Sequence, residues 1–243
     1  MGIADYPLNE DLQRFLQNAV HREPSLVQTG QGSGVATPAL RVPPVEGISA
    51  PEVLVALQHE IGQCTLCRLA AGSQGRVPGQ GRSGSPLMVV GDWSAQGQGC
   101  NPAILFGAEE DVMLWKMMEA IGLRQEGVYV TNILKCCPGG EGAEQECWQD
   151  CFSFLLREIG AVQPRMICAM GELAVRMLVG GTEPLFRLRG RFTVCRYQSA
   201  PPIPVMPTFH PRYLLRNPEM KMATWKDLQA MQKRLGQPGK AKG

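Results

Sequence analysis

The stretch Leu87-Met88-Val89-Val90-Gly91-Asp92 decides the fold class, because a short, continuous apolar run ends in a glycine and a carboxylate. Three more apolar runs, at residues 128–134, 165–170 and 203–206, are also expected to be strands. Apolar residues recur at helical spacing at 109–121, 144–159 and 171–178, and a last helix is expected at 218–235. Continuous apolar strands suit a parallel sheet covered on both faces. The order predicts an α/β fold: a three-layer αβα sandwich with a central four-stranded parallel sheet.

Composition and patterning place this sheet in one domain. The chain has 243 residues, of which 44% are hydrophobic, enough for a sizeable core. Residues 1–49 are expected to be a disordered or loosely helical tail, 50–235 the folded domain, and 236–243 a flexible end. No apolar run approaches the roughly 18 residues of a membrane span, and the polar start does not resemble a signal peptide. We therefore expect a cytoplasmic monomer with no membrane partner.

Polar residues follow three of the predicted strands. Asp92 comes directly after the first, Asn132 lies within the second run, and His210 follows the fourth. Ligands of open parallel sheets bind beyond the carboxyl ends of the strands. Each residue alone could be an ordinary turn, backbone-bonding or packed side chain, but together they predict a site that combines a carboxylate, an amide and an imidazole.

Arginines are concentrated late in the chain. The net charge is only +2, but the segment 186–217 contains six arginines and no acidic residue. Such a local excess indicates a surface that faces phosphates, with a solvated face balanced by acidic neighbours as the alternative. Four of these arginines are our candidates for phosphate contacts, namely Arg189, Arg191, Arg212 and Arg216.

The nine cysteines indicate metal ligands or free thiols rather than a disulfide framework, because no export signal accompanies them. Cys64 and Cys67 form a pair with a two-residue gap, and Cys136 and Cys151 follow on separate elements. Four such thiolates fit a tetrahedral zinc or an iron–sulfur cluster, and the wide second spacing favours the cluster slightly. Neighbouring thiols at 137 and 147 leave the ligand choice open, and those at 100, 168 and 195 look unpaired.

These motifs together resemble the iron–sulfur uracil-DNA glycosylases of family four, over about residues 52–235. The resemblance is carried by the cysteine pair, by the run 87–92, by Val130-Thr131-Asn132-Ile133-Leu134-Lys135-Cys136, by Arg189-Gly190 and by His210-Pro211-Arg212-Tyr213-Leu214-Leu215-Arg216. It implies excision of uracil from single- or double-stranded DNA. It also implies a mainly structural [4Fe-4S] cluster held by Cys64, Cys67, Cys136 and Cys151.

The resemblance also implies roles for the site residues. Phe106 would stack on the uracil ring, Asn132 would read its edge, and His210 would stabilise the leaving base. Asp92 would position the attacking water. Trp93 and Ser94 continue the same turn and are expected to line the base pocket. Leu214 and Leu215 are candidates for a wedge that enters the duplex.

Physical chemistry supports such roles. A base inside a duplex must be swung out before its glycosidic bond can be reached, which costs a few kcal/mol. A flipped uracil needs a flat apolar partner and an amide for its N3–O4 edge. Negative charge develops on the uracil O2 during cleavage, so a histidine donor there favours the transition state.

The first motif departs from the family. The chain has Gly91-Asp92-Trp93-Ser94-Ala95 where relatives usually have Gly-Glu-Ala-Pro-Gly, which shortens the carboxylate arm and adds a bulky ring. The alternatives to an active uracil glycosylase are a catalytically weak or inactive relative that binds DNA, a glycosylase of shifted base specificity, and a zinc protein with an unrelated ligand.

Overall fold

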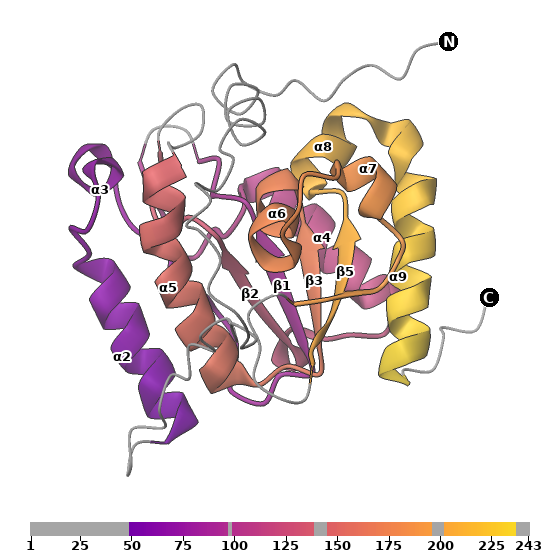
Figure 1. Ribbon diagram of the computed structural model, residues 1–243, viewed down its shortest axis with the longest axis horizontal. Coiled ribbons are helices and arrows are strands. Elements are labelled where there is room, and N and C mark those ends of the chain that lie inside the picture. The colour runs from indigo at the N-terminus through magenta and orange to yellow at the C-terminus, as the bar shows by residue number, and fades with distance from the viewer. Residues whose placement is uncertain (1–48, 97–98, 139–144, 196–201, 237–243) are drawn as a thin grey trace, which may run out of the picture.

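A five-stranded sheet lies at the centre of the computed structural model (Figure 1), which describes residues 49–96, 99–138, 145–195 and 202–236. The predictions for the two tails fall almost wholly outside these residues. The strand order is β2-β1-β3-β5-β4. Four strands run parallel, and β4 pairs antiparallel with β5 at one edge. The bounds are Leu87–Gly91 for β1, Val128–Asn132 for β2, Met166–Met170 for β3, Thr193–Val194 for β4 and Pro204–Thr208 for β5.

The predicted α/β sandwich and its four parallel strands are confirmed, but the strand count of four is too low. The extra strand, β4, is two residues long and contains an exposed valine, so it leaves no apolar run in the sequence. The largest shifts among the predicted strand boundaries are at two strand ends. The second run ends at Asn132 rather than Leu134, and the last strand continues to Thr208.

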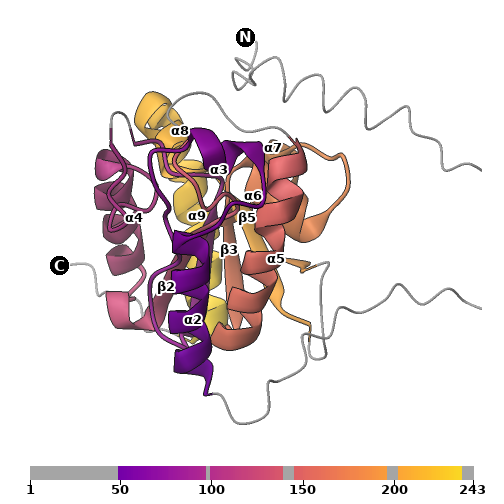
Figure 2. The same ribbon diagram turned by 90° about the vertical axis from the view of Figure 1, so that its left-hand side faces the viewer.

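The alternation of side chains along β1 divides the core into two layers. Met88 and Val90 face one helical layer, whereas Leu87 and Val89 face the other. The first layer contains α5 (Gln145–Val162) and α6 (Glu172–Val179), and the second contains α4 (Ala108–Ala120) and α9 (Lys221–Leu235). Figure 2 shows the strands between these two layers. Burial on both faces explains why the strands are uniformly apolar rather than alternating.

The first described helix, α2 (Ala50–Gly62), is absent from our sequence predictions and packs against α5. Ser49 and Glu52 form a capping box at its start, a signature that the sequence does carry. The short elements are α3 (Arg68–Gly72), η1 (Gln125–Gly127), α7 (Leu185–Leu188), α8 (Pro211–Arg216) and η2 (Pro218–Met220). Across the described residues, no helix combines the length and apolarity that crossing a bilayer requires.

Candidate active site

The parallel register brings the predicted polar residues to one edge of the sheet. Gly91 pairs with Asn132 at the ends of β1 and β2, and Met170 pairs with Thr208 at the ends of β3 and β5. Asp92 follows β1 directly, His210 comes two residues after the end of β5, and both are buried. This edge is where open parallel sheets bind ligands.

Asn132 presents an unpaired acceptor beside an aromatic ring. Its Nδ2 donates to the Leu105 carbonyl at 2.6 Å, whereas its Oδ1 is buried and has no hydrogen-bond partner. A Cβ added at Gly91 would lie only 2.7 Å from this oxygen and would also collide with the Phe106 ring. The glycine, the amide and the ring are therefore in close contact. The Leu105 carbonyl also fixes the amide, because a flipped amide would bring two acceptors together.

Phe106 and His210 form a second contact across this site. Their ring centroids are 4.7 Å apart, and both side chains are buried. Asp111, on the first turn of α4, accepts from the backbone N–H groups of Leu105 and Phe106 at 2.7 and 2.9 Å. This carboxylate holds the chain in place just before α4 begins.

His210 is a neutral hydrogen-bond donor. Its Nδ1 accepts from the Arg212 backbone N–H at 3.1 Å, which places the ring hydrogen of the neutral imidazole on Nε2. That Nε2 is buried and has no partner. Burial, with the nearby positive charge of Arg212 as a further cause, holds the pKa of His210 well below its usual 6.5. The site thus contains one unpaired donor and one unpaired acceptor, and buried polar atoms seldom lack partners without a reason.

Asp92 lies between the sheet and the start of α6. Its Oδ1 accepts from the Ala174 backbone N–H at 2.8 Å, at the positive end of that helix. Gly171 is required beside it, since a Cβ there would lie 2.6 Å from Oδ1. Burial raises the pKa of Asp92 to about 7, while the Ala174 N–H and the charge of Arg212 oppose the rise. The carboxylate is therefore close to half ionised at neutral pH.

Trp93 and Ser94 occupy different surroundings. Trp93 is half-buried, and its carbonyl accepts from Arg212 Nη2 at 3.0 Å. Ser94 is buried and donates to the Ile104 carbonyl at 3.3 Å, while Gln96 bonds both the Ser94 hydroxyl and the same carbonyl. Ser94 thus supports the loop that leads to Phe106.

The predicted DNA-contacting residues divide into exposed and internal positions. Arg191 and Arg216 are exposed, but Arg189 forms a salt bridge with Asp227, and Arg212 is 15% exposed. Leu214 is 1% exposed and belongs to the core, so it does not project as a wedge. Leu215 is half-buried and stays the candidate. Arg189 and Leu214 were assigned from the sequence alone, which does not reveal their tertiary partners.

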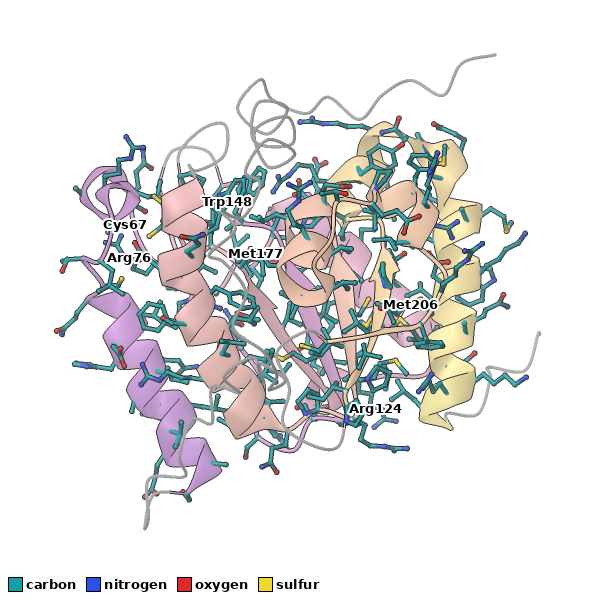
Figure 3. All side chains as sticks on the ribbon, in the orientation of Figure 1. Cys67, Arg76, Arg124, Trp148, Met177 and Met206 are labelled. Carbon is teal, nitrogen blue, oxygen red and sulfur yellow. A yellow bond between two sulfur atoms is a disulfide. The ribbon has the colours of Figure 1, made fainter. Side chains whose placement is uncertain are left out.

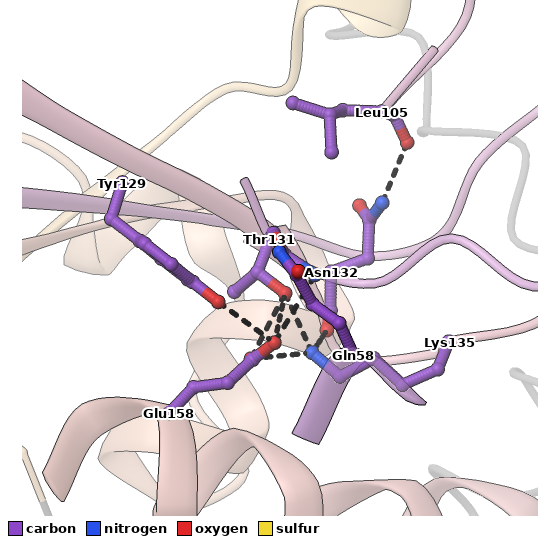
Figure 4. Close-up of polar contacts among 8 residues, drawn as sticks. Gln58, Leu105, Tyr129, Thr131, Asn132, Lys135 and Glu158 are labelled. Carbon is purple, nitrogen blue, oxygen red and sulfur yellow. Dashed lines mark hydrogen bonds and ion pairs between the residues drawn. The ribbon is translucent and has the colours of Figure 1, made fainter. Parts of the chain in front are cut away.

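A buried ion pair between Lys135 and Glu158, which lies on α5, contacts the end of β2 (Figure 4). Lys135 Nζ contacts Glu158 Oε2 at 2.6 Å and also bonds the Thr131 hydroxyl and the Asn132 carbonyl. Tyr129 donates to the same Glu158 carboxylate. Side chains of a strand alternate between faces, so Thr131 points to this network and Asn132 to the site. The network thereby fixes the backbone that carries the Asn132 amide.

The four predicted cluster ligands come together beside α3 and α5. Cys136 is close enough to interact electrostatically with Cys64 and Cys67, and Cys151 with Cys136 and Cys67. Burial raises the pKa of Cys136, and raises that of Cys151 to about 12. Among the described residues, no three His, Cys, Asp or Glu side chains are close enough for one metal ion. Thiols that approach one another in this way are suitable donors for a thiolate-bound metal, either a tetrahedral zinc or an iron–sulfur cluster.

The structure narrows the choice of ligands at one position. Cys137 is joined to Cys100 by a disulfide, so Cys136 is the thiol that faces the other three. Our expectation that Cys100 is unpaired is wrong, because a contact across 37 residues leaves no local pattern. Cys147 is also free and lies against Cys67, so the choice between Cys147 and Cys151 stays open.

Arg76 is a supporting residue that sequence reasoning missed. Its Nη2 donates to the carbonyls of Cys64 and Ala70 at 2.8 and 2.9 Å, which clamps the loop that carries the cysteine pair. Its charge also opposes the rise in the pKa of Cys136. Figure 3 shows Arg76 beside Cys67 at this end of the molecule. Arg76 could not be assigned from the sequence because the groups that it binds are backbone carbonyls, which no sequence motif marks.

Fold and site together define a three-layer α/β protein with buried, unpaired polar atoms beyond the carboxyl ends of its parallel strands. A family model, the uracil DNA glycosylase superfamily, matches residues 78–229. The chain belongs to this superfamily.

The names of the curated relatives point to the same family as the sequence motifs. The Type-4 uracil-DNA glycosylase of Sulfurisphaera tokodaii is 26% identical over 170 residues, which is 68% of this chain and 77% of that protein. The Type-4 enzyme of Archaeoglobus fulgidus is 28% identical over 70% of this chain and 87% of its own. A Type-5 uracil-DNA glycosylase of Pyrobaculum aerophilum is 31% identical, but over only 46% of this chain. The resemblance drawn from the motifs is confirmed.

Proposed function

We propose that this protein hydrolyses the N-glycosidic bond of uracil in DNA after the base is flipped out of the helix. The observation that carries the proposal is the pair of buried, unpaired atoms, Asn132 Oδ1 and His210 Nε2, on two residues that both lie close to the Phe106 ring. The Type-4 relatives support the same activity.

Base reading follows from the fixed amide of Asn132. Its Oδ1 accepts from the N3–H of uracil, and the second hydrogen of Nδ2 is available to O4. Cytosine carries an acceptor at N3 and a donor at the neighbouring position, so it meets like groups on both atoms. Because the Leu105 carbonyl prevents the amide from flipping, the site rejects cytosine.

Departure of the base depends on His210. As the bond to the sugar breaks, negative charge builds on uracil O2, and the Nε2–H of a neutral imidazole donates to it. The donor is already unpaired and held by its Nδ1 bond, so little reorganisation is needed. We assign Asp92 to the sugar side, where an ionised carboxylate favours the cationic sugar and an attacking water.

DNA contacts are assigned to Arg191 and Arg216, the exposed arginines of the predicted set, and to Leu215, its half-buried leucine. The [4Fe-4S] cluster would be held by Cys64, Cys67, Cys136 and Cys151. When bound, it would tie the start of α3, the segment after β2 and α5 together, and it would take no part in bond cleavage. We expect the enzyme to act as a monomer in the cytoplasm on single- or double-stranded DNA.

The test is uracil release from a labelled oligonucleotide, followed by alkali to break the strand at the abasic site. We expect cleavage by the wild type and loss of cleavage in Asn132→Ala and His210→Ala. An intact oligonucleotide that still binds the protein would favour the alternative of a non-cutting DNA-binding relative. Release of another base but not of uracil would favour shifted specificity, and the Trp93 ring is the feature that could cause it.

A further inference from the structure

Arg212 differs from the other arginines of its segment because its guanidinium is turned inward. Its side chain is 15% exposed, whereas Arg216, on the same helix α8, is exposed. An arginine that contacts DNA phosphates needs a guanidinium open to the solvent. The sequence-based assignment of Arg212 to DNA therefore does not explain where its side chain lies.

The side chain instead joins three segments. Nη2 donates to the Trp93 carbonyl at 3.0 Å, and the guanidinium carbon lies 5.2 Å from the centroid of the Trp93 ring. Nε lies 3.8 Å from Glu110 Oε1, at the start of α4. α8 also packs directly against α4. One cation thus connects the turn after β1, the first turn of α4 and α8.

Each of these segments carries one residue of the proposed site. Trp93 directly follows Asp92, and α4 begins just after Phe106. The backbone N–H of Arg212 itself bonds His210 Nδ1 at 3.1 Å. The same residue therefore orients the imidazole through its backbone and fixes the neighbouring turn through its side chain.

We propose that Arg212 is a positioning residue, which holds the Asp92 turn, Phe106 and His210 in one arrangement around the flipped base. The proposal rests on the proposed function and assigns to Arg212 a role in the rate of bond cleavage rather than in DNA affinity. Trp93, the bulky residue of the divergent turn, is on this view one of the contacts that Arg212 uses.

Electrostatics act in the same direction. The charge of Arg212 lowers the pKa of His210 and opposes the rise in the pKa of Asp92, so it favours a neutral imidazole and an ionised carboxylate together. Two further sets of charged groups lie near these residues. Glu110 on α4 faces the Arg212 guanidinium. Glu172 on α6 lies near Asp92 and interacts with Arg176. Removal of Arg212 should raise both pKa values.

The test compares Arg212→Ala and Arg212→Lys with two matched arginine controls. Arg216→Ala removes an exposed arginine from the same helix, and Arg124→Ala removes one from the opposite end of the sheet (Figure 3). The readouts are kcat and KM for uracil excision, the pH profile of kcat, and the salt dependence of affinity for an undamaged oligonucleotide. Circular dichroism and iron content monitor folding.

We expect Arg212→Ala to lower kcat by about tenfold to a hundredfold, the cost of a small misplacement at a reacting centre. The slope of log affinity against log salt should not change, and the acid limb of the kcat profile should move to higher pH. Arg212→Lys should recover part of kcat. Arg216→Ala should instead raise KM and flatten the salt slope by about 0.7 to 0.9, and Arg124→Ala should match the wild type.

Two results would overturn the proposal. One is an Arg212→Ala variant that keeps kcat but flattens the salt slope as Arg216→Ala does, which would make Arg212 a phosphate contact. The other is an unchanged kcat in a folded Arg212→Lys variant that has lost the hydrogen bond to the Trp93 carbonyl and the contact with the Trp93 ring. This second result also decides the case if Arg212→Ala does not fold. If the wild type itself releases no uracil, the proposed function fails first, and that result is distinguishable from either.

Discussion

Replacement of His210 by alanine is the sharpest perturbation of the proposed chemistry. The variant removes one buried, unpaired donor at Nε2 and leaves the Arg212 N–H without its acceptor. Loss of one such donor costs about 2.7–4 kcal/mol of transition-state stabilisation, which corresponds to roughly a hundredfold to a thousandfold in kcat. KM should change little, because the donor is needed most when charge develops on the base.

The neutral state of His210 gives the same prediction a second, independent readout. Because its pKa lies well below the usual 6.5, the imidazole is neutral on both sides of pH 6.5. The wild-type kcat should therefore not fall as the pH rises from 6 to 8. A histidine that acted as a charged acid would instead lose activity tenfold per pH unit above its pKa.

The assay is single-turnover release of uracil at saturating enzyme, measured over this pH range. His59→Ala is the matched control, because His59 is exposed on α2 and lies outside the site. His210 is not the leaving-group donor if folded His210→Ala retains more than about a tenth of kcat, or if wild-type activity follows a protonated imidazole.

Three other expectations concern the groups around the site. Lys135→Met should lower the free energy of unfolding in urea by about 3–5 kcal/mol, because it leaves the Glu158 charge buried and unpaired. Adding Glu158→Leu to this variant should restore part of that free energy. A loss below about 1 kcal/mol in Lys135→Met would show that the ion pair does not stabilise the fold. The pKa of Asp92 is about 7 when folded and 3.8 ordinarily, so its contribution to stability is complete below about pH 4 and lost as the pH rises through 7. Stability of the wild type relative to Asp92→Asn should thus fall by about 1.4 kcal/mol per unit from pH 5 to 7 and no further above 8, and a flat difference would contradict the assignment. Cys136→Ser should lose iron, sulfide and the brown colour of the purified protein, whereas Cys168→Ser, at a buried thiol in β3, should keep all three; a colourless wild type that contains zinc would exclude the cluster.

The sequence predicts the sheet well because burial on both faces forces each parallel strand to be continuously apolar. The same rule explains the failure at β4, where two residues at an edge satisfy no such constraint. α2 is absent from the sequence predictions for a different reason, although Ser49 and Glu52 form a capping box at its start: helical spacing of apolar residues, not capping, defines the predicted helices.

The site, too, could be predicted only where local sequence determines the position of a residue. Asp92, Asn132 and His210 could be placed at one edge because strand ends in a parallel sheet coincide. The partners that decide each role could not be predicted, because they are backbone atoms or distant side chains. Arg189 shows this most clearly: its carboxylate partner, Asp227, lies on α9, and nothing in the acid-free segment 186–217 signals it.

A comparison of two substrates tests whether a fixed Asn132 amide and a neutral His210 donor read and release uracil. The rate of base release by the wild type should be measured on oligonucleotides that are identical except for uracil or cytosine at one position. Uracil should be released faster by roughly 10⁴-fold, as expected where a site built for specific hydrogen bonds meets the wrong pattern. Equal rates for the two bases, or release of neither, would contradict the account.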